Sequence, residues 1–272
     1  MPDGPVTSSQ IFFAVVSTQL LLGSVALWAY WIRQKLRGEL PVPSRFRSDF
    51  IPVSKLAFIL AVSWVALNFL GDTGSQDFDP DKVSEAVRGS VVLGLMVFWI
   101  LLAALLIQFR RPTDMARLGF RWDDLSGQLR DGFVGFVAAF APVYAVLMAS
   151  YPLRSEEVVH PFLRLVQERG VGSELIWISV AAIVIAPLSE ELMFRVILQS
   201  GLKQWFGTGW GIGLAALIFA SVHGFPDSLG IFPLAIVLGI LYQQRRSFLA
   251  IFTAHALFNA FNLWATAVYF LE

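Results

Sequence analysis

The sequence predicts an all-α, polytopic integral membrane protein with about eight transmembrane helices around an intramembrane polar cavity. Of its 272 residues, 56% are hydrophobic and only 15% are charged, which is unusual for a soluble domain. The apolar residues form eight separate segments, and about 20 helical residues are enough to cross a bilayer core. Ionisable side chains also occur inside three of these segments, where they are costly and by default mark an internal polar site.

The predicted spans differ in length. The sixth and seventh are shorter than a full crossing, so we expect them to tilt or to border a polar cavity. Residues 71–82, with the sequence GDTGSQDFDPDK, predict an exposed loop, and residues 114–126 a short interfacial segment. The spans are expected near residues 10–31, 52–71, 89–108, 132–151, 174–203, 210–223, 229–243 and 247–270.

The distribution of Lys and Arg predicts the orientation of the spans. Alternate connections hold 15 and 5 of these residues, and cytoplasmic connections carry the excess. Both termini are therefore expected outside, with the basic stretches 33–55, 110–130 and 195–205 and the pair at 245–246 in the cytoplasm. We treat the chain as one structural unit, with N-terminal transmembrane helices and basic loops in residues 1–130 and the polar clusters in residues 131–272.

Charge balance and the lack of cysteine exclude several classes of function. The 20 basic residues balance the 20 acidic ones, so no overall field favours nucleic acid as a partner. Without cysteine the chain has no disulfide, thiolate nucleophile or Cys-ligated metal. Only carboxylate, hydroxyl, amide and imidazole chemistry remains.

The first polar cluster lies in the segment VIAPLSEELMFRVILQS, residues 184–200. Pro187 is expected to kink this helix, because proline removes one backbone hydrogen bond and crowds the preceding turn. Glu191 and Arg195 are four residues apart, which predicts an ion pair on one helix face. Glu190 points about 100° away from that pair, so it is free to face a cavity.

Two further clusters lie on later spans. His223 follows Phe219 by four residues, and His255 and Asn259 are also four apart, on one face of the last span. Counted from the cytoplasmic ends at about 1.5 Å per residue, Glu190 and His223 lie roughly 20 Å deep, Asn259 about 18 Å and His255 about 12 Å. These similar depths predict a single site.

The residue types at this predicted site suit hydrolysis. A carboxylate and an imidazole can hold and deprotonate a water, and a second imidazole and an amide can donate to a developing oxyanion. Two histidines and one glutamate would also make a catalytic zinc set, although the H-E-x-x-H spacing is absent. Each of these residues also has a simpler explanation. The charged side chains of residues 190, 191 and 195 would extend to the membrane interface, and the histidines would be ordinary packing residues. Phe219 would be a wall of the cavity.

At these residues the sequence resembles the CPBP family of intramembrane proteases. That family includes the CAAX prenyl endopeptidases, also called Ras-converting enzymes, and bacterial Abi proteins implicated in bacteriocin self-immunity. Its pattern is E-E-x-x-x-R, then F-x-x-x-H, then H-x-x-x-N or a similar residue. The chain has EELMFR at 190–195, FASVH at 219–223 and HALFN at 255–259, in that order. The resemblance covers roughly residues 130–265.

The resemblance implies a role for each motif residue. Glu190 would be the general base and His223 its partner in activating water, while His255 and Asn259 would stabilise the oxyanion. Glu191 and Arg195 would be structural or would orient the substrate. The family is described as metal-independent, so no cofactor or metal is expected.

The resemblance also implies an activity and a place for it. We expect an endopeptidase that cleaves near the C-terminus of a membrane-attached peptide or protein, CAAX-like or hydrophobic. Its site would open toward the cytoplasm, and a bacterial plasma membrane is the expected location. The lipid bilayer and the substrate are the expected partners. The alternatives are a non-catalytic scaffold or immunity protein that binds a peptide in the same cavity, and a zinc-dependent membrane hydrolase.

Overall fold

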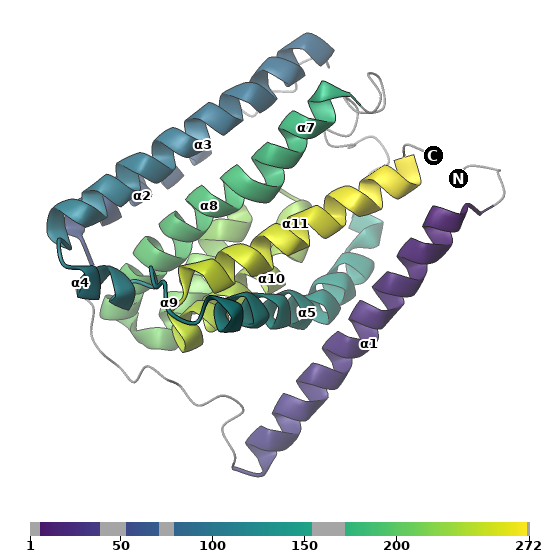
Figure 1. Cartoon of the computed structure of the whole chain (residues 1–272), viewed down its shortest axis with the longest axis horizontal. Coiled ribbons are helices and arrows are strands. Elements are labelled where there is room, and N and C mark those ends of the chain that lie inside the picture. The colour runs from purple at the N-terminus through teal and green to yellow at the C-terminus, as the bar shows by residue number, and fades with distance from the viewer. Residues whose placement is uncertain (1–5, 39–52, 71–78, 154–171, 271–272) are drawn as a thin grey trace.

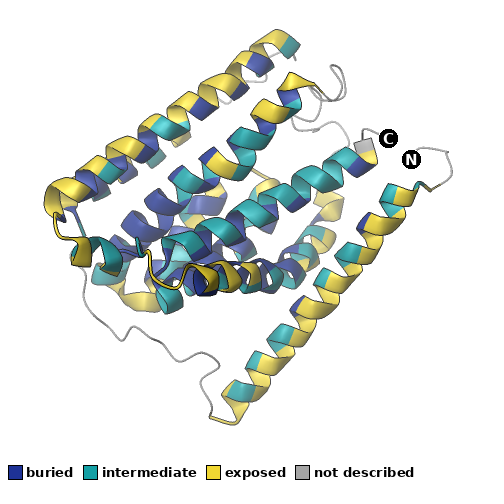
Figure 2. Ribbon diagram, in the orientation of Figure 1, coloured by how far each residue is buried: buried dark blue, intermediate teal, exposed yellow. Residues whose placement is uncertain are grey.

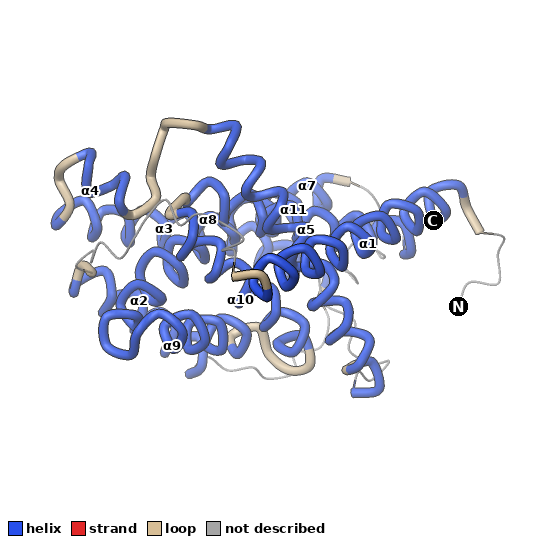
Figure 3. The backbone as a smooth tube through the Cα atoms, turned by 90° about the horizontal axis from the view of Figure 1, so that it is seen from below, coloured by secondary structure: helices blue, strands red, loops and turns tan. Residues whose placement is uncertain are grey.

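The computed structural model describes residues 6–38, 53–70, 79–153 and 172–270. Within these ranges every regular element is helical and no strand occurs (Figure 3). The predicted all-α class is confirmed. The elements are α1 (Ser8–Leu36), α2 (Lys55–Leu70), α3 (Pro80–Gln108), α4 (Pro112–Arg117), α5 (Leu125–Ala149), the 3₁₀ turn η1 (Tyr151–Leu153), α7 (Ser173–Ser179), the π-helical η2 (Val180–Ile185), α8 (Ala186–Glu191), the π-helical η3 (Leu192–Gln199), α9 (Ser200–Ser221), α10 (Asp227–Arg245) and α11 (Phe248–Phe270).

Six helical stretches in the described residues are long and apolar enough to cross a membrane, as expected for an integral membrane protein. The second predicted span is a shorter apolar helix of 16 residues, α2. The predicted count of eight spans is not confirmed by this. The six stretches are Ser8–Leu36, Pro80–Gln108, Leu125–Ala149, Ser173–Ser221, Asp227–Arg245 and Phe248–Tyr269.

The long stretch Ser173–Ser221 is not one straight helix. Gly207 has φ 80° and ψ 171°, a conformation that is essentially restricted to glycine. A Cβ placed on Gly211 would lie 2.8 Å from the Cα of Lys203. In a straight helix these residues would be about 12 Å apart, so the chain turns back at Gly207. The turn falls between the predicted fifth span, 174–203, and the predicted sixth span, 210–223.

Several element ends differ from the prediction. Helix α3 begins nine residues before the predicted start at 89, because the Asp79 side chain caps it and Pro80 fits the first helical position. Residues 80–82 of the predicted 71–82 loop are therefore helical, and 71–78 lie outside the described residues. The predicted interfacial segment 114–126 contains most of α4 and the first residues of α5. The predicted division at residue 130 falls inside α5.

The described helix ends beside the most Lys- and Arg-rich connections lie at one end of the helix bundle, which we call the basic face. These connections are the stretches 33–55, 110–130 and 195–205 and the pair at 245–246. Arg245 at the end of α10 pairs with Asp131 near the start of α5 at 3.1 Å. The N–H of Phe248, where α11 begins, donates to the carbonyl of Gly119 at 2.9 Å. The ends of α1 and α3 lie toward the same end of the bundle as α4 (Figure 1).

We call the opposite end the terminal face, because α1 begins there and α11 ends there. The ring of Phe13 on α1 packs against that of Tyr269 on α11, with centroids 5.6 Å apart. Ser84 on α3 donates to Glu174 on α7 at 2.8 Å. The starts of α1, α3 and α7 and the end of α11 therefore lie together (Figure 1).

The best-buried part of the bundle is the stretch from the end of α8 into α9. All ten residues from 191 to 200 are buried, although they include two charged side chains. Helices α2, α3, α9, α10 and α11 pack against this stretch or the end of α8, and α1 and α3 have largely exposed outer sides (Figure 2). The core thus surrounds the motif that carries Glu191 and Arg195.

Candidate active site

The paired glutamates end α8, a short α-helix between two π-helical segments. A π-helical turn bonds i to i+5 and often occurs at functional sites. Segment η2 precedes Pro187 almost directly, where a kink was predicted. The N–H of Ala186 bonds to the carbonyl of Ala181, five residues back. The same pattern would pair the carbonyl of Ala182 with residue 187, but proline has no N–H. That carbonyl therefore needs another donor.

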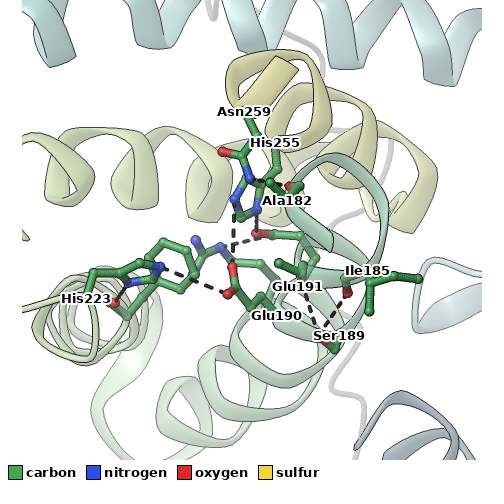
Figure 4. Close-up of polar contacts among 11 residues, drawn as sticks. Ala182, Ile185, Ser189, Glu190, Glu191, His223, His255 and Asn259 are labelled. Atoms are coloured by element: carbon green, nitrogen blue, oxygen red, sulfur yellow. Dashed lines mark hydrogen bonds and ion pairs between the residues drawn. The ribbon is translucent and has the colours of Figure 1, made fainter. Parts of the chain in front are cut away.

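Asn259 supplies this donor. Its Nδ2 donates to the carbonyl oxygen of Ala182 at 2.7 Å (Figure 4). The resemblance implies only an oxyanion role for this amide. In the structure one amide hydrogen is used by the backbone of η2, and the amide carries a second hydrogen for other partners. Asn259 therefore joins α11 to the helix that carries the glutamates.

The predicted ion pair between Glu191 and Arg195 is present. The Nε of Arg195 lies 3.3 Å from Oε2 of Glu191, and both side chains are completely buried. The guanidinium also lies over the ring of Phe219, 4.6 Å from the ring centre. Within the described residues its nitrogens make no hydrogen bond, so the carboxylate and the ring face are what compensate its charge.

His255 makes a contact that the sequence interpretation missed. Its Nδ1 lies 2.8 Å from Oε1 of Glu191, so Glu191 touches both Arg195 and His255. A carboxylate can only accept, so Nδ1 carries the hydrogen and Nε2 faces the other way. The sequence did offer a chemical reason to expect this contact. A buried carboxylate has two oxygens that need hydrogen-bond partners, and Arg195 accounts for only one of them.

Glu190 lies between the two histidines (Figure 4). Its Oε1 is 4.0 Å from Nε2 of His223, and its Oε2 is 3.8 Å from Nε2 of His255. His223 uses Nδ1 at 2.7 Å from the carbonyl of Phe219, which can only accept, so Nε2 of His223 is the nitrogen that faces Glu190. These gaps are too long for direct hydrogen bonds, but one water about 2.8 Å from each group can bridge either of them.

These side chains line a cavity of about 700 Å³ whose walls are mostly apolar. Glu190, His223, His255 and Asn259, which the sequence placed in one site, all line it. The sequence interpretation missed other polar lining residues, in particular Asn262 and Thr266. Both follow Asn259 at helical spacing on α11, so the periodicity that linked His255 with Asn259 would have found them. The lining also includes Ser189, Asn68, Ser90 and Asp227.

The buried part of the cavity lining lies toward the basic face, and exposed lining residues lie toward the terminal face. His255, Phe219 and Leu234 are all at most 3% exposed, and they lie on the basic-face side of the cavity. Asp227, the first residue of α10, and Ser90 of α3 are exposed and line its other end. The predicted location of both termini outside and the predicted opening toward the cytoplasm stay predictions. The number of residues along each helix predicts how deep a polar side chain lies in the membrane. It does not predict which half of the bundle is filled by large side chains.

In the part of the chain that the structure describes, no three His, Asp or Glu side chains form a group that could hold a metal ion. His223, His255 and Glu190 are the residues that would bind zinc in the alternative hypothesis. Their closest N–O distances are 4.0 and 3.8 Å. The zinc hypothesis stays a prediction.

Comparison with known proteins finds one family model that matches this part of the chain. The model of the family described as type II CAAX prenyl endopeptidase Rce1-like matches residues 172–261. The resemblance predicted from the motifs is thereby confirmed. The matched segment is about a third of the chain and contains all seven motif residues, but it begins later than the predicted start near 130. The Rce1-like family is a protease family, which supports a protease at that level. No curated protein matches the chain, and no solved structure matches it.

Proposed function

We propose that the chain is an intramembrane endopeptidase that hydrolyses a peptide bond near the C-terminus of a membrane-attached, CAAX-like or hydrophobic peptide or protein. One observation carries the proposal: the carboxylate of Glu190 lies 4.0 and 3.8 Å from the Nε2 atoms of His223 and His255, at the wall of an apolar cavity. The match of residues 172–261 to the Rce1-like family supports it. A bacterial plasma membrane is the proposed location.

The reaction starts with a water held between Glu190 and His223. Glu190 takes a proton as the water oxygen adds to the carbonyl carbon, and Nε2 of His223 accepts a hydrogen bond that orients the water. The tetrahedral intermediate carries its negative charge on the former carbonyl oxygen. When the C–N bond breaks, the proton on Glu190 passes to the leaving amine. No covalent enzyme intermediate is formed.

The oxyanion needs hydrogen-bond donors near Glu190. The second amide hydrogen of Asn259 is one, since the first is bound to Ala182. His255 is the other, but its Nδ1 is already used by Glu191. It can donate from Nε2 only when both ring nitrogens carry hydrogen.

The experiment compares variants reconstituted in liposomes with two peptides, one prenylated at a C-terminal cysteine and one with an unmodified hydrophobic C-terminus. Glu190→Gln and His223→Ala are expected to lower the hydrolysis rate by about 10²- to 10⁴-fold, the usual contribution of general acid–base catalysis. Glu85→Gln is the matched control, because Glu85 is an exposed glutamate on α3. It should retain the parent rate.

Three other results would count against the proposal. Unchanged hydrolysis in both Glu190→Gln and His223→Ala would exclude this mechanism. Loss of activity with a chelator and its return with Zn²⁺ would favour the zinc hydrolase. Peptide that is bound equally by the parent and by Glu190→Gln, with cleavage in neither, would favour the non-catalytic scaffold.

A further inference from the structure

A second cavity, of about 310 Å³, lies between α1, α5 and α10. Among the residues that the structure describes, it shares no lining residue with the cavity at Glu190. Cavities that bind small molecules have volumes from about 300 Å³ upward. Helix α1 lies along one edge of the bundle, and most of its surface is not covered by other helices (Figure 1). The second cavity therefore lies where the bundle meets the lipid of the membrane.

The lining of this cavity is apolar at one end and charged at the other. At the apolar end, the Nε1 of Trp28 donates to the carbonyl of Ala138 at 2.8 Å, which joins α1 to α5. The charged end is lined by Lys35 near the end of α1, Asp131 near the start of α5 and Arg245 at the end of α10. Seven residues separate Trp28 from Lys35, so the apolar wall extends for about 10 Å along α1. The cavity thus has the polarity of a lipid, with its charged end at the basic face.

The charges at this end sum to a positive value. Arg245 pairs with Asp131 at 3.1 Å, so these two side chains largely compensate each other. Lys35 is exposed and adds a further positive charge. Basic pockets between transmembrane helices are typical sites for anionic lipid headgroups. The charged end is therefore complementary to a headgroup with a net negative charge.

We propose that this second cavity binds an anionic phospholipid. One acyl chain lies between α1 and α5, and the phosphate lies beside Lys35 and Arg245. The chain supplies contact atoms to a wall that would otherwise lack them on one side. The phosphate accepts charge-assisted hydrogen bonds, which are stronger than those between neutral groups. The lipid thereby links α1 to α5 and α10, and it does so without any residue of the proposed hydrolytic site.

Native mass spectrometry of the full chain in detergent measures the affinity for phosphatidylglycerol and for phosphatidylcholine with the same acyl chains. The parent is expected to bind the anionic lipid more tightly. Lys35→Gln should weaken phosphatidylglycerol binding about fivefold, which is the usual effect of one lysine near an anionic lipid surface, and leave phosphatidylcholine binding unchanged. Lys55→Gln is the matched control, because Lys55 is exposed at the start of α2 and does not line the cavity.

A second variant tests the apolar end. Val134→Trp should fill the cavity with a ring and weaken phosphatidylglycerol binding at least as much as Lys35→Gln does. Phe133→Trp is its control, because Phe133 is 51% exposed and does not line the cavity. Lys35 is an exposed residue whose substitution leaves the packing intact, so the test stays decisive if Val134→Trp does not fold.

Three results would overturn the proposal. The first is equal affinity of the parent for the two lipids. The second is a loss of phosphatidylglycerol binding in Lys55→Gln as large as in Lys35→Gln. The third is unchanged phosphatidylglycerol binding in folded Val134→Trp, because the headgroup would then be attracted by surface charge alone.

Discussion

Arg195 is completely buried and is compensated by one carboxylate and one aromatic ring. A buried ion pair is not a reliable source of stability, because removing both charges from water costs about as much as their attraction returns. Breaking such a pair is different, since it leaves one buried charge without a partner. The pair of Arg195 with Glu191 therefore acts as a structural constraint: neither member can be lost alone without a large cost.

The first prediction concerns this pair. Arg195→Met should lower the free energy of unfolding by about 3–5 kcal/mol, because Glu191 is left buried without its guanidinium. Adding Glu191→Gln should recover part of the loss. The measurement is chemical unfolding in detergent micelles. Lys82→Met is the control: Lys82 and its partner Asp79 are both exposed, so its loss should cost at most about 1 kcal/mol. Equal effects of Arg195→Met and Lys82→Met would refute the argument.

At the scale of elements, η2 and α11 depend on each other through one hydrogen bond. The π-helical pattern before Pro187 leaves the carbonyl of Ala182 without a backbone donor, and Asn259 provides one from another helix. An unpaired polar backbone group costs free energy at membrane depth. The motif asparagine therefore has a structural task next to the chemical one implied by the family.

The second prediction tests this dependence. Asn259→Ala should lower the free energy of unfolding by about 1–3 kcal/mol, because the carbonyl of Ala182 loses its donor. In that background Pro187→Ala adds an N–H at the position five residues after Ala182, so it should recover part of the loss. Asn262→Ala is the control, because its known partner is Tyr144 and not the backbone of η2. If Pro187→Ala affected both asparagine variants equally, the proposed link would be wrong.

At the scale of the whole molecule, the cavity divides the bundle into a filled half and an open half. The filled half, toward the basic face, contains the stretch 191–200, in which every residue is buried. The open half is bordered by α2, α3, α7, α10 and α11. A peptide that enters must therefore pass between these helices before it reaches Glu190.

The third prediction tests whether this open half is used. Ser90→Trp should place a large ring at an exposed part of the cavity lining and lower kcat/KM by about tenfold or more, which corresponds to about 1.4 kcal/mol. Val92→Trp is the control on the same helix, because Val92 is 59% exposed and does not line the cavity. Peptide hydrolysis in liposomes is the measurement. A loss of rate in Val92→Trp as large as in Ser90→Trp would show that the ring acts in another way.

Much of the fold and the grouping of the site residues could be predicted from the sequence. Apolar segment length identified most of the helices, because lipid requires continuous backbone hydrogen bonding. A constant rise per residue placed Glu190, His223 and His255 at similar depths, and the structure brings them together. Their chemical roles stay predictions.

Other features could not be predicted, because they depend on how helices pack rather than on spacing within one helix. The contact between Glu191 and His255 and the bond from Asn259 to Ala182 each join elements more than 60 residues apart. The π-helical segments also change which residues share a helix face around the motif. Predictions based on ideal α-helical spacing therefore cannot give these faces correctly. The direction of the cavity depends on which half of the bundle large side chains fill.

Of the two adjacent carboxylates, only Glu191 has a guanidinium within ion-pair distance among the described residues. In the proposed reaction, Glu190 is ionised again once the amine has left, and the acyl fragment ends in a new carboxylate beside it after its acid proton has passed to water. Two like charges 4 Å apart repel by about 1 kcal/mol in water and about 4 kcal/mol near a protein surface. The residue that starts the cleavage therefore also favours departure of the acidic fragment, because no guanidinium in the described part of the chain lies within ion-pair distance to offset its charge.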